Sequence, residues 1–241
     1  MITFEQIRDN LAEIEERIGL ACARSNRPRE AVKLIAVSKM NPAETVTAAI
    51  KAGQNIFGEN KVQELCAKQE ELKKSCPVTP EWHLIGHLQT NKVKDVVGRV
   101  AMIHSVDSVK LAETIDRESA KKGIVTDILL EVNVSGEDSK FGLKTEDVPD
   151  VVDRISKLPN IKLKGLMTVP PYTSDPGSNR IYFKKLKDLS VDISSKNIDN
   201  ISMDVLSMGM TGDFEVAIEE GATHVRVGTG IFGARDYTVV K

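Results

Sequence analysis

The sequence is poor in the features that mark secreted, membrane-spanning and nucleic-acid-binding proteins. It has three cysteines and no Cys-x-x-Cys pair, which is typical of reduced intracellular thiols rather than of a disulfide framework. No apolar run approaches the ~18 residues that span a bilayer, and the N-terminus is an acidic amphipathic segment rather than a signal peptide. The net charge of −2 gives no reason to expect a nucleic-acid or membrane partner. We therefore expect a cytoplasmic protein.

The sequence instead shows a regular alternation of short apolar runs and helical patterns. Residues 3–25 carry apolar side chains at three- and four-residue steps behind a capping box of Thr3 and Gln6, which predicts a helix. Beyond it, the predicted strands cover residues 32–38, 55–57, 82–85, 102–106, 125–134, 161–169, 202–207 and 224–227. The predicted helices between them cover residues 42–52, 60–74, 90–97, 108–122, 145–158, 178–195 and 211–220.

Strict alternation of strand and helix predicts a parallel sheet with right-handed crossovers. Eight such units in 241 residues favour an α/β fold of the (β/α)8 TIM-barrel type, formed by one domain that spans residues 1–241. No helix follows the last strand, so the extra N-terminal helix (residues 1–28) is expected to cover the gap between the last strand and the first. The alternative is an open, doubly wound sheet, which would need no such substitution.

In a parallel barrel, the carboxyl ends of all strands meet at one face, where ligands bind. The first predicted strand delivers Lys39 to that face, and a desolvated lysine can form a Schiff base. The loops after the last two strands carry Ser207, Gly209, Gly228 and Thr229. Their hydroxyls and closely approachable backbone N–H groups suit a phosphate.

Other patterns in the sequence carry less chemistry. Gly228–Gly233 reads G-x-G-x-x-G, but too few residues follow it for a dinucleotide-binding unit. His83 and His87 stand four residues apart across a strand and its exit, and no third ligand has a suitable spacing, so we expect no metal site. The charged stretch Lys68–Lys74 is interpreted as a solvated helix face, and the strand residues His104 and His224 as structural.

Several segments together resemble one known family, the pyridoxal 5′-phosphate (PLP) homeostasis proteins, which are single-domain relatives of the alanine racemase barrel. These segments occur in the family's order and cover nearly the whole chain. They are Leu34–Lys39, Phe57–Glu64, Trp82–Gln89 with Asn91 and Lys92, Gly165–Thr168, Leu206–Asp213 and Val225–Gly233. The chain departs from the usual pattern at Gly230, where the family has Ala, and at Thr211, where it has Ser.

The resemblance implies a set of PLP contacts. Lys39 would form an aldimine with the cofactor and Arg226 would face the pyridine nitrogen. The remaining implied contacts are Asn60 near the ring, Met167 packed beside it, and Ser207, Met208, Gly209, Gly228 and Thr229 around the phosphate.

The expected activity follows from Arg226 and from the length of the chain. Arginine can only donate hydrogen bonds, so it would leave the pyridine nitrogen unprotonated and the cofactor a weak electron sink. The short stretch after the last strand leaves no room for a second domain with another acid–base group. We therefore expect no catalytic activity and a monomer that buffers PLP or delivers it to apo-enzymes, maintaining vitamin B6 and amino-acid homeostasis. The alternative is an enzyme, either a weak amino-acid racemase or a Schiff-base aldolase.

Overall fold

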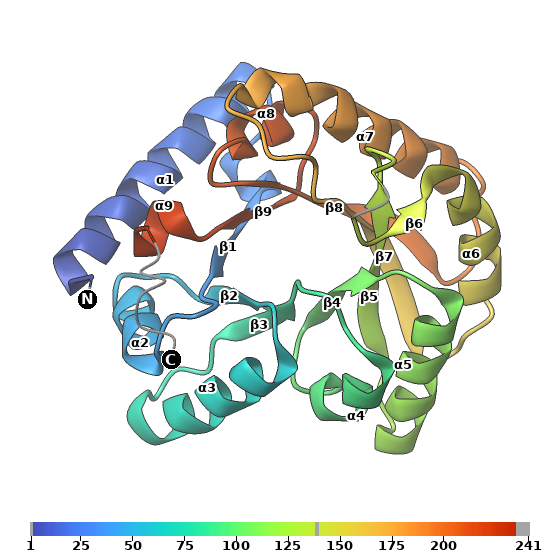
Figure 1. Cartoon of the computed structure of the whole chain (residues 1–241), viewed down its shortest axis with the longest axis horizontal. Helices are drawn as coiled ribbons and strands as arrows, with labels where there is room; N and C mark the ends of the chain where they lie inside the picture. Colours follow the sequence, from blue (N-terminus) through green and yellow to red (C-terminus); the bar gives the residue numbers. More distant parts are fainter. Residues whose placement is uncertain (1, 138–139, 235–241) are drawn as a thin grey trace.

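The computed structural model describes residues 2–137 and 140–234, and within them eight parallel strands close into a barrel (Figure 1). The strands are β1 (Lys33–Val37), β2 (Ile56–Glu59), β3 (Glu81–Leu84), β4 (Met102–Val106), β5 (Thr126–Asn133), β7 (Ile161–Met167), β8 (Ile201–Met210) and β9 (His224–Val227). Pairing of β1 with β9 and of β4 with β5 leaves the barrel strands without an open edge. The predicted barrel is confirmed, and the open-sheet alternative is wrong.

Helices surround the barrel in Figure 1. They are α1 (Phe4–Arg24), α2 (Ala43–Lys51), α3 (Val62–Ser75), α4 (Val93–Val96), α5 (Val109–Lys122), α6 (Val148–Ile155), α7 (Arg180–Ser194), α8 (Phe214–Glu219) and α9 (Thr229–Phe232). The helices predicted over 90–97 and 145–158 each begin instead as a 3-10 turn, at Thr90–Lys92 and Thr145–Asp147. The two-residue strand β6 (Leu143–Lys144) and the single turn α9 were not predicted, because elements so short carry no periodic pattern.

Helix α1 takes the place of the missing eighth crossover helix. It lies between α8 and α2 on the outside of the barrel and packs against both, and also against α9 (Figure 1). Its capping box is present: Gln6 N donates to Thr3 Oγ1 at 3.2 Å and Thr3 N donates to Gln6 Oε1 at 2.9 Å. Its buried face, which includes Ile7 and Ile18, joins the main apolar core between the helices and the strands.

Alternate residues along each strand point into the barrel. Met102, Leu129, Met167 and Val205 form a separate apolar cluster of buried residues, contributed by β4, β5, β7 and β8. Three of the four histidines in the sequence are also buried in the strands. Among the described residues, no helix has the length and apolar character needed to cross a membrane.

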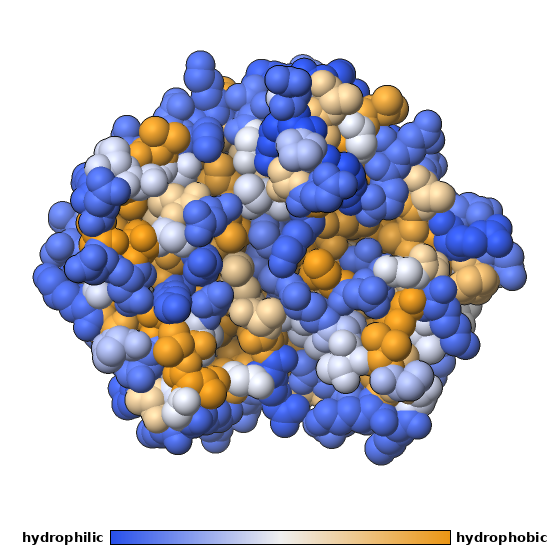
Figure 2. Space-filling view, turned by 180° about the vertical axis from the view of Figure 1, so that it is seen from behind, coloured by the Kyte–Doolittle hydropathy of each residue, from blue (hydrophilic) through white to orange (hydrophobic). Residues whose placement is uncertain are grey.

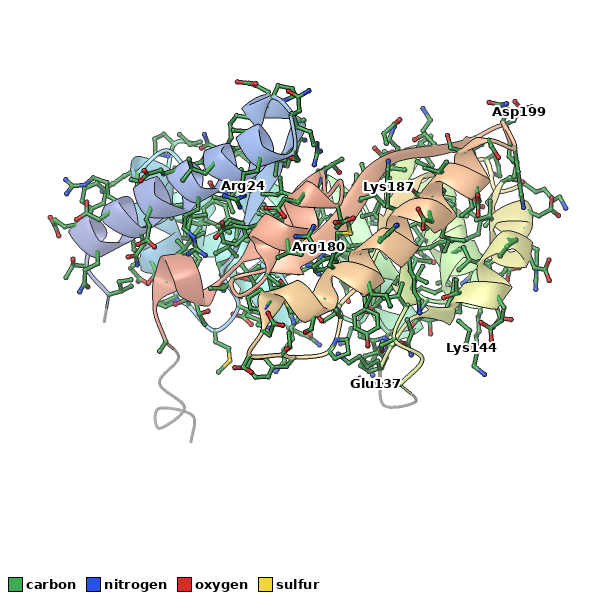
Figure 3. The ribbon with its side chains drawn as sticks, turned by 90° about the horizontal axis from the view of Figure 1, so that it is seen from above. Arg24, Glu137, Lys144, Arg180, Lys187 and Asp199 are labelled. Atoms are coloured by element: carbon green, nitrogen blue, oxygen red, sulfur yellow. The ribbon has the colours of Figure 1, made fainter. Side chains whose placement is uncertain are left out.

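The two ends of the barrel differ in what they carry. In the side view of Figure 3, the ends toward which the strands run lie at the lower edge, near Glu137 and Lys144, and Asp199 marks the opposite end. Figure 2 shows that opposite end, where hydrophilic side chains surround smaller groups of apolar ones.

Candidate functional site

A pocket of about 360 Å³ opens at the carboxyl ends of the strands. It brings Arg226 together with Lys39 and Asn60, which lie more than a hundred residues earlier in the sequence. The segments that follow β7, β8 and β9 form most of the rest of the wall. Its other lining residues are Val37, Ile85, Val169, Pro171, Tyr172, Thr173, Asn179, Met210, Thr211, Gly212, Asp213, Gly228 and Thr229.

Lys39 is half-buried and lies in the turn between β1 and α2. Asn41 N donates to Ser38 O at 3.0 Å across this turn, and Met40 has a φ of 65°. A left-handed backbone at a residue other than glycine is uncommon and persists where the surrounding contacts hold it. The turn that presents Lys39 therefore needs support from its neighbours.

Lys68 supplies that support from α3. Its ammonium donates to Ser38 O at 2.7 Å, to Glu59 Oε1 at 2.6 Å and to Glu64 Oε1 at 2.7 Å. Glu64 Oε1 also accepts from Met40 N at 2.5 Å. The interpretation of this stretch as a solvated face is wrong at Lys68, which is 5% exposed, because buried acceptors of the turn and of Glu59 replace its water.

Glu59 is fully buried beside this lysine. Burial raises the pKa of its carboxyl, and the charge and hydrogen bond of Lys68 oppose that rise. Ser38 Oγ donates to Glu59 Oε1 at 2.6 Å, whereas no described group bonds Glu59 Oε2. Lys68 is therefore the main compensation for a buried carboxylate as well as a support of the turn.

Asn60 reaches the pocket because two loops approach each other closely. A Cβ atom on Gly86 would lie 2.5 Å from Asn60 O and 2.6 Å from Asn60 Cα. Only glycine fits such an approach, so Gly86 sets the position of Asn60.

Arg226 lines the pocket but is only 4% exposed. Its Nη1 donates to Ser207 Oγ at 2.7 Å and its Nη2 donates to Thr168 O at 2.8 Å. Burial lowers the pKa of the guanidinium to about 10, against the opposing effect of Asp213 and Glu131. At neutral pH it remains a cation that can only donate.

The expected placement of Ser207, Met208 and Gly209 in a loop is wrong. Strand β8 continues to Met210 rather than ending at Ser207, so these residues belong to the sheet and none lines the pocket. Ser207 is fully buried inside the barrel, and Met208 belongs to the core outside it. Gly209 packs on α8, where a Cβ atom would lie 2.6 Å from Ala217 Cβ.

Thr211 and Gly212 follow β8 and line the pocket. Thr211 Oγ1 accepts from Gly228 N and Gly230 N at 3.3 Å each, which ties the loop after β8 to the loop after β9. Asp213 is held by Met210 N at 2.7 Å and by Asn179 Nδ2 at 2.8 Å. In the sequence, Thr211 could be recognised as a pocket residue only because it belongs to the Leu206–Asp213 motif.

The remaining predicted residues divide between pocket and core. Gly228 and Thr229 line the pocket, as expected for residues that follow β9. Met167 is fully buried in the apolar cluster inside the barrel, with Leu129 and Val205, and does not line this cavity. Its expected contact with the ligand stays a prediction.

His83 and His87 take separate partners. His83 bonds Glu81 and His104 inside the barrel, whereas His87 Nδ1 lies 3.2 Å from Asp107 Oδ2 and its ring stacks on Phe141. Within the described part of the chain, no group of three or more His, Cys, Asp or Glu residues has a metal-binding arrangement.

Comparisons with known proteins cover nearly the whole chain. The family model described as alanine racemase, N-terminal domain, matches residues 3–236. The chain is 45% identical over 229 residues to the pyridoxal phosphate homeostasis protein of Aquifex aeolicus, covering 95% of this chain and 98% of that protein. It is 40% identical over 231 residues to the protein of that name in Pseudomonas aeruginosa, covering 96% of each.

Solved structures agree with the fold. PipY of Synechococcus elongatus, determined with PLP bound, is 37% identical with a TM-score of 0.79, covering 91% of this chain and 100% of that one. An alanine racemase of Clostridium difficile has a TM-score of 0.69 at 16% identity. It covers 98% of this chain and 59% of the racemase, so this likeness concerns the barrel alone.

The first prediction concerns Lys68. Replacing Lys68 by Met leaves Glu59 buried without its counter-charge, which should lower the free energy of unfolding by about 3–5 kcal/mol near neutral pH. The pKa of Glu59 is raised in the folded state, so a proton neutralises it and part of the loss should be recovered in acid. Urea unfolding at pH 5 and pH 8 measures both effects, with the exposed Lys73→Met on the same helix as the control. Equal losses at the two pH values would contradict this role.

The second prediction concerns the two departures from the family pattern. A Cβ atom on Gly230 would lie 3.1 Å from Thr211 Cγ2 and 3.2 Å from Ile14 Cδ1, so the larger Thr211 is matched by the smaller Gly230. Gly230→Ala should therefore destabilise by about 1–3 kcal/mol through overpacking.

Adding Thr211→Ser should recover part of that loss, because the serine lacks the crowding methyl group. Gly19→Ala is the control, since nothing lies within 4 Å of its added Cβ. Additive changes in the free energy of unfolding for Gly230→Ala and Thr211→Ser, measured by thermal or urea unfolding, would refute the compensation.

Proposed function

The chain belongs to the family of pyridoxal phosphate homeostasis proteins, and on that premise we propose that it binds PLP in the pocket at the carboxyl ends of the strands. One observation carries the proposal: a half-buried lysine, a buried arginine and a loop pair rich in N–H and hydroxyl donors line one cavity of about 360 Å³. These are the groups that an aldehyde, a pyridine nitrogen and a phosphate require.

Each group of the ligand has a matching residue. Bound PLP supplies an aldehyde that condenses with an amine, and a ring that can accept electrons. Lys39 offers the amine at the end of a supported turn. Thr211, Gly212, Gly228 and Thr229 offer hydroxyl and backbone donors for the phosphate. Asn60 offers a polar contact beside the ring.

Arg226 favours binding over turnover. Its guanidinium is a buried cation fixed by Ser207 and Thr168, so a pyridine nitrogen facing it accepts a hydrogen bond and stays unprotonated. In PLP enzymes the partner of this nitrogen is an aspartate or an arginine; an acidic partner holds the nitrogen protonated, whereas an arginine leaves it neutral and the ring a weaker electron sink. The proposed role is therefore to buffer PLP or to deliver it to apo-enzymes, which would maintain vitamin B6 and amino-acid homeostasis.

The other titratable residues of the pocket wall support the same conclusion. Tyr172 is 96% exposed, so water rather than protein groups surrounds it. Asp213 is held by Asn179 and Met210 N. We infer that neither serves as the second acid–base group that a racemase would need, since Tyr172 lies in solvent and Asp213 already accepts two hydrogen bonds from the protein.

The proposed setting is a monomer in the cytoplasm. Cys22, Cys66 and Cys76 are free thiols, which suits a reducing compartment. Apo-enzymes that require PLP are the proposed recipients.

The third prediction tests the ligand and the lysine together. Borohydride should fix a phosphopyridoxyl group on Lys39 when the protein is incubated with PLP, because it reduces the bond between aldehyde and amine. Lys39→Ala should lose both the adduct and the visible absorption of bound PLP. Lys61→Ala, which removes a neighbouring exposed lysine, should keep both. Peptide mapping that finds the adduct mainly on another lysine would overturn the proposal.

A further inference from the structure

A continuous hydrogen-bond chain crosses the interior of the barrel. Glu81 Oε1 lies 2.8 Å from His83 Nε2, and His83 Nδ1 lies 2.7 Å from His104 Nε2. His104 Nδ1 lies 2.9 Å from Ser207 Oγ, which accepts from Arg226 Nη1 at 2.7 Å. The five residues come from β3, β4, β8 and β9.

This hydrogen-bond chain joins the two ends of the barrel. Glu81 is the first residue of β3, at the end opposite the pocket, and its side chain is 38% exposed. His83, His104 and Ser207 are at most 1% exposed. Arg226 lines the pocket at the other end. None of the three middle residues lines the pocket, and the site described above gives a role only to Ser207, as a hydrogen-bond acceptor for Arg226.

The direction of the first two bonds follows from the charge of Glu81. Its hydrogen bond with His83 lowers the pKa of the carboxyl to about 2, so it is an acceptor at neutral pH. His83 must then carry a proton on Nε2. In the neutral tautomer with its proton on Nε2, the Nδ1 atom of His83 is unprotonated and accepts from the Nε2–H group of His104; an imidazolium at His83 would instead donate from Nδ1 and reverse the next two bonds.

The direction of the last two bonds follows from His104. Burial, together with His83, His224 and Arg226, lowers the pKa of this imidazole well below its usual range, so it is neutral. When His104 carries its proton on Nε2, its Nδ1 atom accepts a hydrogen bond from the Ser207 hydroxyl. The Ser207 oxygen then presents its lone pairs to Arg226. Every donor in the chain points from Arg226 toward Glu81.

We propose that this directed chain fixes the guanidinium of Arg226, and that Ser207, His104 and His83 are positioning residues for the pocket. A lone serine hydroxyl can rotate and donate in other directions. In this protein the Ser207 hydroxyl donates its hydrogen bond to His104, so the Ser207 oxygen is held as an acceptor for Arg226 Nη1. Thr168 O accepts from Arg226 Nη2. The carboxylate of Glu81 sets the tautomers of both histidines. The effect of the hydrogen-bond chain on ligand binding rests on the proposed function, whereas the direction of its hydrogen bonds does not.

Other charged and titratable groups surround the chain without interrupting it. The ring of His224 lies 6.0 Å from that of His83 and 6.1 Å from that of His104, measured between centroids. Its Nδ1 pairs with Thr223 Oγ1 at 3.0 Å. Lys33 Nζ lies 3.5 Å from Glu81 Oε1 at the exposed end. His224 is therefore a matched control, since it is a buried imidazole beside the chain but outside it.

The experiment first uses the ligand-free protein labelled with 15N-histidine, whose four histidines give a sparse NMR spectrum. We expect the proton on Nε2 of both His83 and His104 at pH 7. Ser207→Ala should shift the Nδ1 resonance of His104, and Glu81→Gln should release His83 into a mixture of tautomers, because an amide can donate as well as accept. His224→Gln should leave both residues unchanged. A proton on Nδ1 of His104 in the wild-type protein would overturn the chain's direction.

The second measurement is PLP affinity by absorbance titration. Ser207→Ala removes one hydrogen bond to the charged Arg226, so its affinity for PLP should fall about tenfold. His224→Gln should bind PLP with the affinity of the wild-type protein. Unchanged affinity in Ser207→Ala, with wild-type binding intact, would refute the positioning role. A wild-type protein that shows the expected tautomers but does not bind PLP would instead refute the proposed function. Thermal unfolding of each variant confirms that it is folded.

Discussion

The buried cation of Arg226 is the constraint on which the pocket depends. A guanidinium carries five N–H donors and loses most of its hydration at 4% exposure, so the barrel must supply acceptors on its inner side. Ser207 and Thr168 O do so from β8 and from the end of β7. The guanidinium also lines the cavity, so a ligand bound there can reach it.

A second buried cation supports a neighbouring part of the pocket wall, since the turn after β1 lies beside β9. Lys68 bonds the carbonyl of Ser38 and two glutamates, and thereby supports the turn that carries Lys39. Breaking a buried ion pair from one side is costly, so both parts of the pocket wall are tied to the stability of the barrel. This arrangement suits a protein that holds a reactive ligand in one geometry.

The order of elements could be predicted from the sequence because strand and helix periods alternate without interruption from residue 32 onward. Lys39, Asn60, Arg226, Gly228 and Thr229 could be placed at one face because the ends of parallel strands meet there. The end of β8 could not be predicted, since Ser207–Met210 reads as a glycine-containing loop yet pairs with β9. Which face Lys68 presents, and which histidines meet inside the barrel, depend on strand register and packing that no local pattern records.

We propose that Arg226 makes this pocket a holder of PLP rather than a catalyst. The most direct test is deuterium incorporation at the α-carbon of alanine, normalised to bound cofactor, in the wild-type protein and in Arg226→Glu. A glutamate favours a protonated ring and places a negative charge in the pocket, so the variant should bind PLP more weakly but exchange faster per bound cofactor. Wild-type exchange near the ~10 s⁻¹ typical of enzymes, abolished by Arg226→Glu, would contradict the claim.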